Sequence, residues 1–152
     1  MVEYAVITDT SCLILLDNIQ ALHILQSVYN HIITTPEVAA EFKKPLPEWI
    51  QVMTVRNSQL IAVYCLQVDI GEASAIALAQ EIPDTLLIVD DFKGRRLASQ
   101  LNIKFTGTLG VLIAAKQQNK IPSLRPYFEL IKSTNFRINP LLLERILKDL
   151  EN

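Results

Sequence analysis

Short apolar runs alternate along the chain with longer stretches in which apolar residues recur on one helical face. Apolar runs rich in β-branched residues and bounded by turn residues are typical of buried strands, whereas recurrence at the helical period is typical of helices. The runs predict strands at residues 4–8, 31–33, 50–55, 85–89 and 103–105. The helical spacing predicts helices at residues 18–28, from residue 36 onward, from residue 71 to the stop at Pro83, and at 93–101, 108–119, 125–133 and 140–150. Residues 57–67 are ambiguous, with some helical character.

Strands that alternate with helices predict a parallel sheet with both faces covered. The predicted fold class is therefore α/β, a three-layer α/β/α sandwich around a central parallel sheet. The chain has 152 residues, half of them hydrophobic, which suits a single domain spanning residues 1–152. Trp49 is expected to pack against this core. The apolar side chains of the last helix are expected in the core or on a dimer surface: Leu141, Leu142, Ile146 and Leu150.

Composition limits the compartment and the partners. No apolar run is long enough to cross a bilayer, and no basic region precedes a long apolar stretch at the N-terminus. We therefore expect no membrane association, no signal peptide and a cytoplasmic location. The formal net charge of −2 offers no globally basic surface, so nucleic-acid binding would depend on a local basic patch. Cys12 and Cys65 have apolar neighbours and are predicted to be buried free thiols.

Two predicted strands are followed directly by aspartate. Asp9 follows the strand at 4–8, and Asp90 and Asp91 follow the strand at 85–89. Ligands of open α/β sheets gather at the carboxyl ends of the strands, so these side chains lie where function is expected. Taken alone, Asp9 fits the N-cap of a following apolar helix equally well.

Two glutamates extend this pattern. Glu72 shares its helical face with three apolar residues, Ala75, Ile76 and Ala79. This face directs the carboxylate toward the sheet, which a favourable interaction with the helix dipole alone would not explain. Glu41 lies on the same side of its helix as Val38, although a surface position near a helix end is slightly favoured by the pattern alone.

The donor types point to a hard metal ion. Carboxylates gathered in a low-dielectric cleft repel one another, and their pKa values rise unless a cation neutralises them. Oxygen ligands without His or Cys suit Mg²⁺ or Mn²⁺ rather than zinc. One or two such ions support in-line phosphoryl transfer, the chemistry of nucleases and phosphatases. His23 and His31 have no carboxylate or thiol at ligand spacing and are expected at the surface or at an interface.

Five segments in order resemble one known family. They are residues 7–16 (ITDTSCLILL), 35–42 (TPEVAAEF), 71–79 (GEASAIALA), 87–98 (LIVDDFKGRRLA) and 106–112 (TGTLGVL). In this order and spacing they are similar to the PIN-domain-like proteins of the DUF3368 family, from Val6 to about Leu147. The resemblance implies a PIN fold and a Mg²⁺- or Mn²⁺-dependent endoribonuclease acting on RNA. It also implies a type II toxin with a small DNA-binding antitoxin as partner, and a homodimer.

The resemblance also assigns the site residues. Asp9 matches the family's aspartate after the first strand, and Glu41 matches its glutamate in the helix after the second strand. Glu72 stands where many PIN nucleases have an aspartate, which lengthens one ligand arm by a methylene. The pair Asp90 and Asp91 stands in place of the usual Thr-x-Asp or Ser-x-Asp, and we expect both to contribute to metal binding and catalysis, directly or through water.

Basic and hydroxyl side chains flank these acids. Lys93, Arg95 and Arg96 follow the late aspartates and are candidates for holding RNA phosphates, although a solvated helix face whose charge compensates the acids is favoured. Thr10 and Ser11 are further candidates, with helix capping at least as good an explanation. Gly107 and Gly110 suggest a tight turn and close backbone packing where a helix begins.

Two other functions fit the pattern less well. A phosphorylated receiver-type domain would place its acidic pair after the first strand and a single aspartate later, which is the reverse of the order here. The second alternative is a weakly active or inactive PIN-like module that binds RNA or protein. Acids at every expected place argue against a wholly inactive site.

Overall fold

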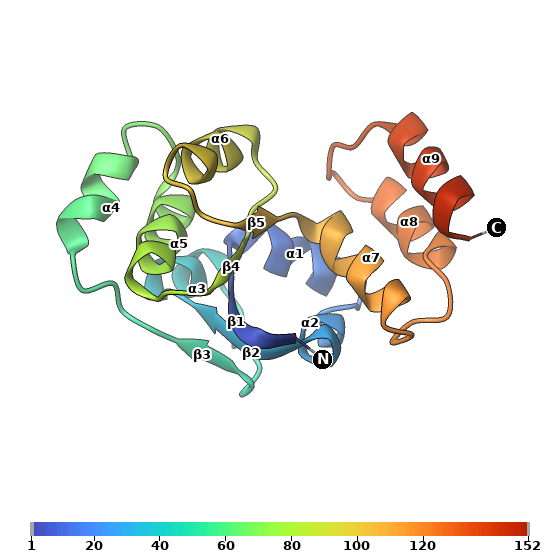
Figure 1. Ribbon diagram of the computed structural model, residues 1–152, viewed down its shortest axis with the longest axis horizontal. Coiled ribbons are helices and arrows are strands. Elements are labelled where there is room, and N and C mark those ends of the chain that lie inside the picture. Colours follow the sequence, from blue (N-terminus) through green and yellow to red (C-terminus); the bar gives the residue numbers. More distant parts are fainter. Residues whose placement is uncertain (1, 152) are drawn as a thin grey trace.

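A five-stranded parallel sheet forms the centre of the protein (Figure 1). The computed structural model describes residues 2–151 and the side chains of residues 5–151. The strand order is β3 (Ile50–Val52), β2 (Tyr29–Thr34), β1 (Val2–Thr8), β4 (Leu86–Ile88) and β5 (Phe105–Thr106). In the central strand, Val6 lies opposite Ile32 on one side and Leu86 on the other. The predicted α/β class and parallel sheet are confirmed.

Helices cover both faces because successive residues of a strand point to opposite sides of the sheet. Val6, Ile32 and Ile88 belong to one apolar core, whereas the residues beside them in each strand belong to a second core. The first core is covered by α1 (Thr10–Asn18), α2 (His23–Val28), α7 (Thr108–Gln117), α8 (Arg125–Lys132) and α9 (Pro140–Leu150). The second is covered by α4 (Ser58–Tyr64), α5 (Ile70–Glu81) and α6 (Phe92–Gln100). Figure 1 shows these two groups of helices on opposite sides, and the predicted three-layer sandwich is confirmed.

Several helices begin at the carboxyl edge of the sheet with a side-chain cap. The capping side chains belong to Asp9 for α1, Thr35 for α3 (Pro36–Phe42), Asp69 for α5 and Asp91 for α6. Each accepts a hydrogen bond from a backbone N–H of the first turn, which would otherwise lack a partner. The chain therefore turns from strand to helix beside the acidic residues.

Of the helix predicted at residues 18–28, the second half forms, as α2. The structure has α1 at Thr10–Asn18, a turn in which Gln20 adopts a φ of 56°, and then the short helix α2. The residues on several sides of α1 are buried, among them Cys12, Leu13, Leu15 and Leu16. A helix buried on several sides has no single apolar stripe, so helical periodicity does not reveal it.

Two predicted strands differ at their ends. The strand predicted at 50–55 is shorter, because Val52 already pairs with Thr34, the last residue of β2. The strand predicted at 103–105 instead forms Phe105–Thr106, opposite Leu87 and Ile88. The ambiguous segment at 57–67 contains the helix α4.

The prediction of two buried thiols holds only for Cys12. Cys12 is fully buried in α1, and burial raises the pKa of its thiol above the ordinary value. Cys65 is exposed, because it follows the last residue of α4, where Val63 and Leu66 also face solvent. Apolar neighbours in sequence therefore did not indicate burial at this position.

The C-terminal helix divides its leucines between core and surface. Leu143 and Leu147 are buried, and Ile146 and Leu150 pack against the same core. Leu141 and Leu142 are exposed. Trp49 packs against the first core as predicted. Within residues 2–151, none of the helices has both the length and the apolar character needed to span a membrane.

Candidate functional site

Asp9 stands at the carboxyl end of β1 and is 1% exposed. Its Oδ1 accepts a hydrogen bond of 3.0 Å from the backbone N–H of Cys12, which makes Asp9 the N-cap of α1. Its Oδ2 is buried and has no hydrogen-bond partner. Burial, followed by the negative charge of Asp90, raises the pKa of Asp9 to about 8. Asp9 therefore caps a helix with one oxygen and leaves the other unused.

Asp90 follows β4 and is held by the first residue of α7. Its Oδ1 accepts a hydrogen bond of 2.8 Å from the backbone N–H of Thr108, and its Oδ2 accepts one of 2.6 Å from the Thr108 hydroxyl. Gly107 permits this approach, because a Cβ at Gly107 would lie 2.7 Å from Asp90 Oδ1. The close backbone packing predicted at Gly107 is thus present, and it fixes the carboxylate of Asp90.

Glu72 lies in the first turn of α5 and is 7% exposed. Its Oε2 is buried without a hydrogen-bond partner. Burial, followed by the charges of Asp69, Asp91 and Asp9, raises the pKa of Glu72 to about 8. The absence of a side chain at Gly94 leaves room for this carboxylate, because a Cβ there would lie 2.6 Å from Glu72 Oε2. The buried orientation predicted for Glu72 is what the structure shows.

Asp69 belongs to the same acidic group and was missed from the sequence. It is the N-cap of α5, and its Oδ1 accepts a hydrogen bond of 3.1 Å from the backbone N–H of Glu72. Its charge contributes to the raised pKa values of both Asp9 and Glu72. Its position before a predicted helix was the available signal, because an aspartate there is typical of an N-cap.

Asp91 differs from its neighbour Asp90. It is exposed and caps α6, where its Oδ2 accepts hydrogen bonds from the backbone N–H groups of Lys93 and Gly94 at 3.0 and 3.3 Å. Its charge nevertheless reaches Glu72 and contributes to the raised pKa there. The structure therefore places Asp90 beside Asp9 and Asp91 beside Glu72.

Glu41 reaches the same edge of the sheet from α3. Its Oε1 accepts a hydrogen bond of 2.8 Å from the hydroxyl of Thr10, the residue after Asp9. A Cβ at Gly71, the residue before Glu72, would lie 1.8 Å from this same oxygen. Glu41 is half-buried, so it is not the solvated surface residue that the pattern alone slightly favoured.

The basic and hydroxyl candidates separate into two groups. Arg95 is half-buried, donates from Nε to the carbonyl oxygen of Val89 at 2.9 Å, and lies over the ring of Phe105 at 5.7 Å. Thr10 is engaged with Glu41. Lys93, Arg96 and Ser11 are exposed. Of these three, Lys93 lines the same hollow as Asp69, Glu72 and Asp91.

A hollow of about 430 Å³ opens between the start of α6 and the segment that joins α4 to α5. We name it the acidic cleft; it is lined by residues 65–69, Glu72, Asp91 and Lys93. One wall carries carboxylates, and Lys93 supplies a positive charge on the rim. The cleft is therefore an accessible route to the buried carboxylate of Glu72.

A divalent metal ion needs several oxygen donors close together. In this conformation, no group of three or more acidic, histidine or cysteine side chains within the described residues is set to hold one. Yet buried oxygens without partners on Asp9 and Glu72, close to further carboxylates, are a set of hard donors that a divalent cation would satisfy. The residues present thus fit Mg²⁺ or Mn²⁺ by chemistry. The two histidines are elsewhere: His23 is exposed on α2, and His31 contacts Gln51 at 2.7 Å.

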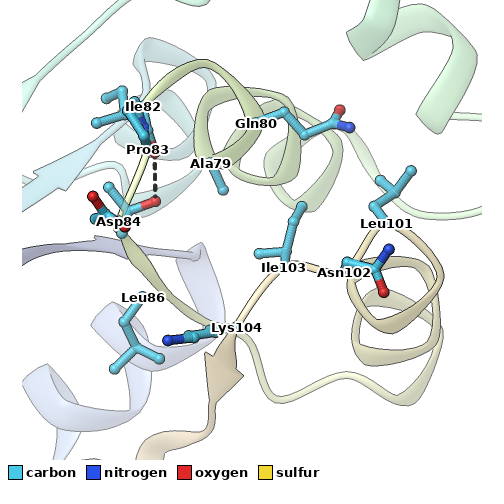
Figure 2. A pocket seen from close by; sticks show the side chains of 11 residues that line it. Ala79, Gln80, Ile82, Pro83, Asp84, Leu86, Leu101, Asn102, Ile103 and Lys104 are labelled. Atoms are coloured by element: carbon cyan, nitrogen blue, oxygen red, sulfur yellow. Dashed lines mark hydrogen bonds between the residues drawn. The ribbon is translucent and has the colours of Figure 1, made fainter.

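A second hollow, of about 580 Å³, lies at the opposite edge of the sheet (Figure 2). It is bounded by the ends of α5 and α6 and by the beginning of β4, with Gln80, Asp84, Asn102 and Lys104 among its polar residues. No candidate from the sequence lies there. The catalytic candidates are all at the carboxyl edge, where ligands of open α/β sheets bind.

Comparison with known proteins gives one family. The model of the DUF3368 family, described as a PIN domain, matches residues 5–152. No curated protein matches the chain. PIN domains are generally nucleases and typically use divalent metals. A match over nearly the whole chain, together with the five-stranded parallel sheet, shows that this protein belongs to the DUF3368 family of PIN domains.

Proposed function

We propose that this PIN-domain protein is an endoribonuclease that depends on Mg²⁺ or Mn²⁺ and hydrolyses phosphodiester bonds of RNA. The observation that carries the proposal is the pair of buried oxygens without partners, Asp9 Oδ2 and Glu72 Oε2. Leaving a buried oxygen unsatisfied costs about 1–3 kcal/mol. Glu37 Oε1 and Gln118 Oε1 are also buried without a partner, so the proposal depends on the further carboxylates whose charges act on Asp9 and Glu72.

Four carboxylates supply the ligands in this proposal. Asp9, Glu72 and Asp90 are the central donors, and Glu41 approaches from the side of Thr10 and Gly71. A divalent cation bound there supplies an activated water and neutralises charge that develops on the phosphate. Asp69 and Asp91 add negative charge that favours cation binding. Side-chain rotation of the glutamates would bring the donors together.

The protein's own contacts orient these donors. Thr108 fixes both oxygens of Asp90, and the backbone N–H of Cys12 fixes one oxygen of Asp9. Thr10 holds Glu41. Because the contacts of Asp9 and Asp90 use backbone groups and a short side chain, these two carboxylates are positioned before a substrate arrives.

The test is cleavage of mixed single-stranded RNA with Mn²⁺ by the wild type and by Asp9→Asn. We expect cleavage by the wild type and none by Asp9→Asn. Asp84→Asn is the matched control: Asp84 is exposed at the opposite edge with a φ of 59°, a conformation that asparagine also adopts. Equal cleavage by wild type and Asp9→Asn would contradict the proposal, as would no cleavage by a wild type shown to bind Mn²⁺.

One observation favours a second candidate function, an RNA- or protein-binding PIN module with little or no activity. No described group of three donors is set to hold an ion in this conformation. RNA binding that does not depend on Mn²⁺ and is unaffected by Asp9→Asn would support this candidate over the nuclease.

We further propose that the protein is the toxin of a type II toxin–antitoxin pair, acts in the cytoplasm as a homodimer, and is neutralised by a small DNA-binding antitoxin. The support is the resemblance of its five motifs to a family in which such toxins are common. Expression without the partner should stop growth, and Asp9→Asn should relieve the arrest. Growth arrest that persists in Asp9→Asn would contradict this role for the nuclease site.

A further inference from the structure

Phe92 is an aromatic residue that the fold leaves in solvent. It is the first residue of α6 and is 75% exposed. The buried face of α6 consists instead of Gly94, Leu97 and Ala98. The packing of the helix therefore does not account for a large ring at this position.

Phe92 lies in the sequence between two residues that line the acidic cleft. Its two neighbours in sequence, Asp91 and Lys93, both line the cleft, and Glu72 lies in the same hollow. Across from them, the segment after α4 brings Leu66 to the cleft with 85% of its surface exposed. The hollow is thus lined by an aliphatic residue and carboxylates, and the exposed ring of Phe92 belongs to the same first turn of α6 as the lining residue Lys93.

Two cations on α6 lie close to Phe92 in the chain and offset part of the negative charge of the cleft. Lys93 lines the cleft, and Arg96 is exposed one turn further along α6, a spacing that places the two cations on neighbouring parts of the helix surface. The N–H groups of Lys93 and Gly94 are already occupied by Asp91. Positive side chains of α6, rather than the helix N-terminus, are therefore what a phosphate would meet.

We propose that the acidic cleft takes an unpaired nucleotide of the RNA substrate, with its base stacked on Phe92 and its phosphate beside Lys93. The proposal rests on the ribonuclease function above and adds Phe92 as a residue that positions the single-stranded substrate. A base already stacked and paired in a duplex presents no free face to an aromatic ring, whereas an unpaired base does. The cleft volume of about 430 Å³ is in the range of sites for small organic ligands.

The experiment measures binding separately from cleavage. A fluorescently labelled single-stranded RNA oligonucleotide is titrated with protein, with Ca²⁺ in place of Mn²⁺, and anisotropy is recorded while a gel confirms that the RNA is intact. The variants are Phe92→Ala, Phe92→Leu and Phe92→Trp. Leu141→Ala is the matched control, because Leu141 is 77% exposed on α9. It neither lines the acidic cleft nor stands next to a lining residue in the sequence.

Stacking of one base predicts that Phe92→Ala weakens binding by about 5- to 100-fold. Phe92→Leu should be nearly as weak because it keeps an apolar side chain without a ring, whereas Phe92→Trp should bind at least as tightly as wild type. Leu141→Ala should match wild type. The same sequence annealed to its complement should bind wild type more weakly and show little dependence on Phe92.

The outcomes separate the two proposals. Wild-type affinity in Phe92→Ala or Phe92→Leu would overturn the stacking proposal even if the protein cleaves RNA, and so would equal affinity for the duplex. RNA binding that depends on Phe92, in a protein that never cleaves with Mn²⁺, would overturn the nuclease and leave the binding site intact. If Phe92→Ala keeps its RNA affinity but no longer forms a dimer, the stacking proposal is overturned, and Phe92 instead contacts a second copy of the protein. Absence of any RNA binding by wild type would overturn both.

Discussion

The two edges of the sheet differ in the burial and hydrogen bonding of their polar residues. At the carboxyl edge, Asp9 and Glu72 are buried with oxygens that have no partner, and their pKa values are raised to about 8. At the amino edge, the hollow in Figure 2 is larger, yet Asp84 is exposed and Thr85 donates a hydrogen bond of 3.0 Å to the carbonyl of Ile82. The size of a hollow therefore does not single out the candidate site, whereas buried carboxylates with raised pKa values do.

The largest expected effect is on activity. Asp9→Asn removes a charged ligand from the carboxyl edge and should lower RNA cleavage by more than about 100-fold. Asp84→Asn makes the same chemical change at the amino edge and should leave the rate within about 2-fold of wild type, because surface substitutions away from a site have small effects. Initial rates with Mn²⁺ at fixed RNA concentration check both. A comparable loss in Asp84→Asn would break the distinction between the edges.

A smaller loss is expected from filling the space beside Glu41. In Gly71→Ala the new Cβ would lie 1.8 Å from Glu41 Oε1, so the glutamate must move away from Thr10 and the other carboxylates. We expect cleavage to fall by about 10-fold, since small misplacements in a site reduce rates strongly. The change in stability should be small, because the helix preference of alanine over glycine, about 1 kcal/mol, is opposed by the lost hydrogen bond between Thr10 and Glu41 and by the approach of the new Cβ to 2.8 Å from Thr10 Oγ1. Chemical denaturation together with initial rates separates the two effects; an unaltered rate would remove Glu41 from the site.

Stability of the metal-free protein should fall as the pH rises. The carboxyls of Asp9 and Glu72 have pKa values raised to about 8, against about 4 in an unfolded chain. Between these values the folded state binds more protons than the unfolded state, so the free energy of unfolding decreases with increasing pH and levels off above about pH 8. We expect the melting temperature to fall across this range, since each kcal/mol of lost stability lowers it by about 2–4 °C in a domain of this size.

The same carboxyls provide the controls for this pH effect. Asp9→Asn and Glu72→Gln should each flatten the pH profile of the melting temperature, and Asp84→Asn should not. Mn²⁺ should restore stability most strongly at the alkaline end, where the carboxylates carry charge. A profile that rises with pH in the metal-free wild type would contradict the raised pKa values.

The smallest expected effect concerns the amino edge. Thr85→Val removes the hydroxyl that donates to the carbonyl of Ile82 and should destabilise the protein by about 1 kcal/mol. RNA cleavage under conditions where the variant is folded should be unchanged. Urea denaturation and initial rates are the measurements, and a loss of activity in the folded variant would give the amino edge a part in function.

The sequence predicted the carboxyl edge well because strand ends and helical faces are local patterns. Asp9 and Asp90 were located by the strands before them, and Glu72 by the apolar residues on its face. The pattern did not separate Asp90 from Asp91, since that difference comes from Thr108, a contact between residues far apart in the chain. Asp69 was missed because the pattern before it is ambiguous and predicts a helix only from residue 71, whereas α5 begins at Ile70 and Asp69 caps it.

Other errors have a similar cause. The extent of α1 was not predicted, although Asp9 was considered as a helix cap, because its apolar residues are buried on several sides, which hides the helical period. Cys65 was predicted to be buried from its neighbours, although the loop after α4 presents those neighbours to solvent. Burial depends on where an element docks, and local composition does not fix this.

Binding of Mn²⁺ tests the central claim most directly, because it needs no RNA. Calorimetric titration at about pH 7, in buffers of different ionisation enthalpy, measures both affinity and proton release. Since Asp9 and Glu72 hold protons at that pH in the metal-free protein, the account predicts saturable binding that releases protons, and loss of that binding in Asp9→Asn but not in Asp84→Asn. Absence of saturable binding to the folded wild type, or equal binding to Asp9→Asn, would contradict it.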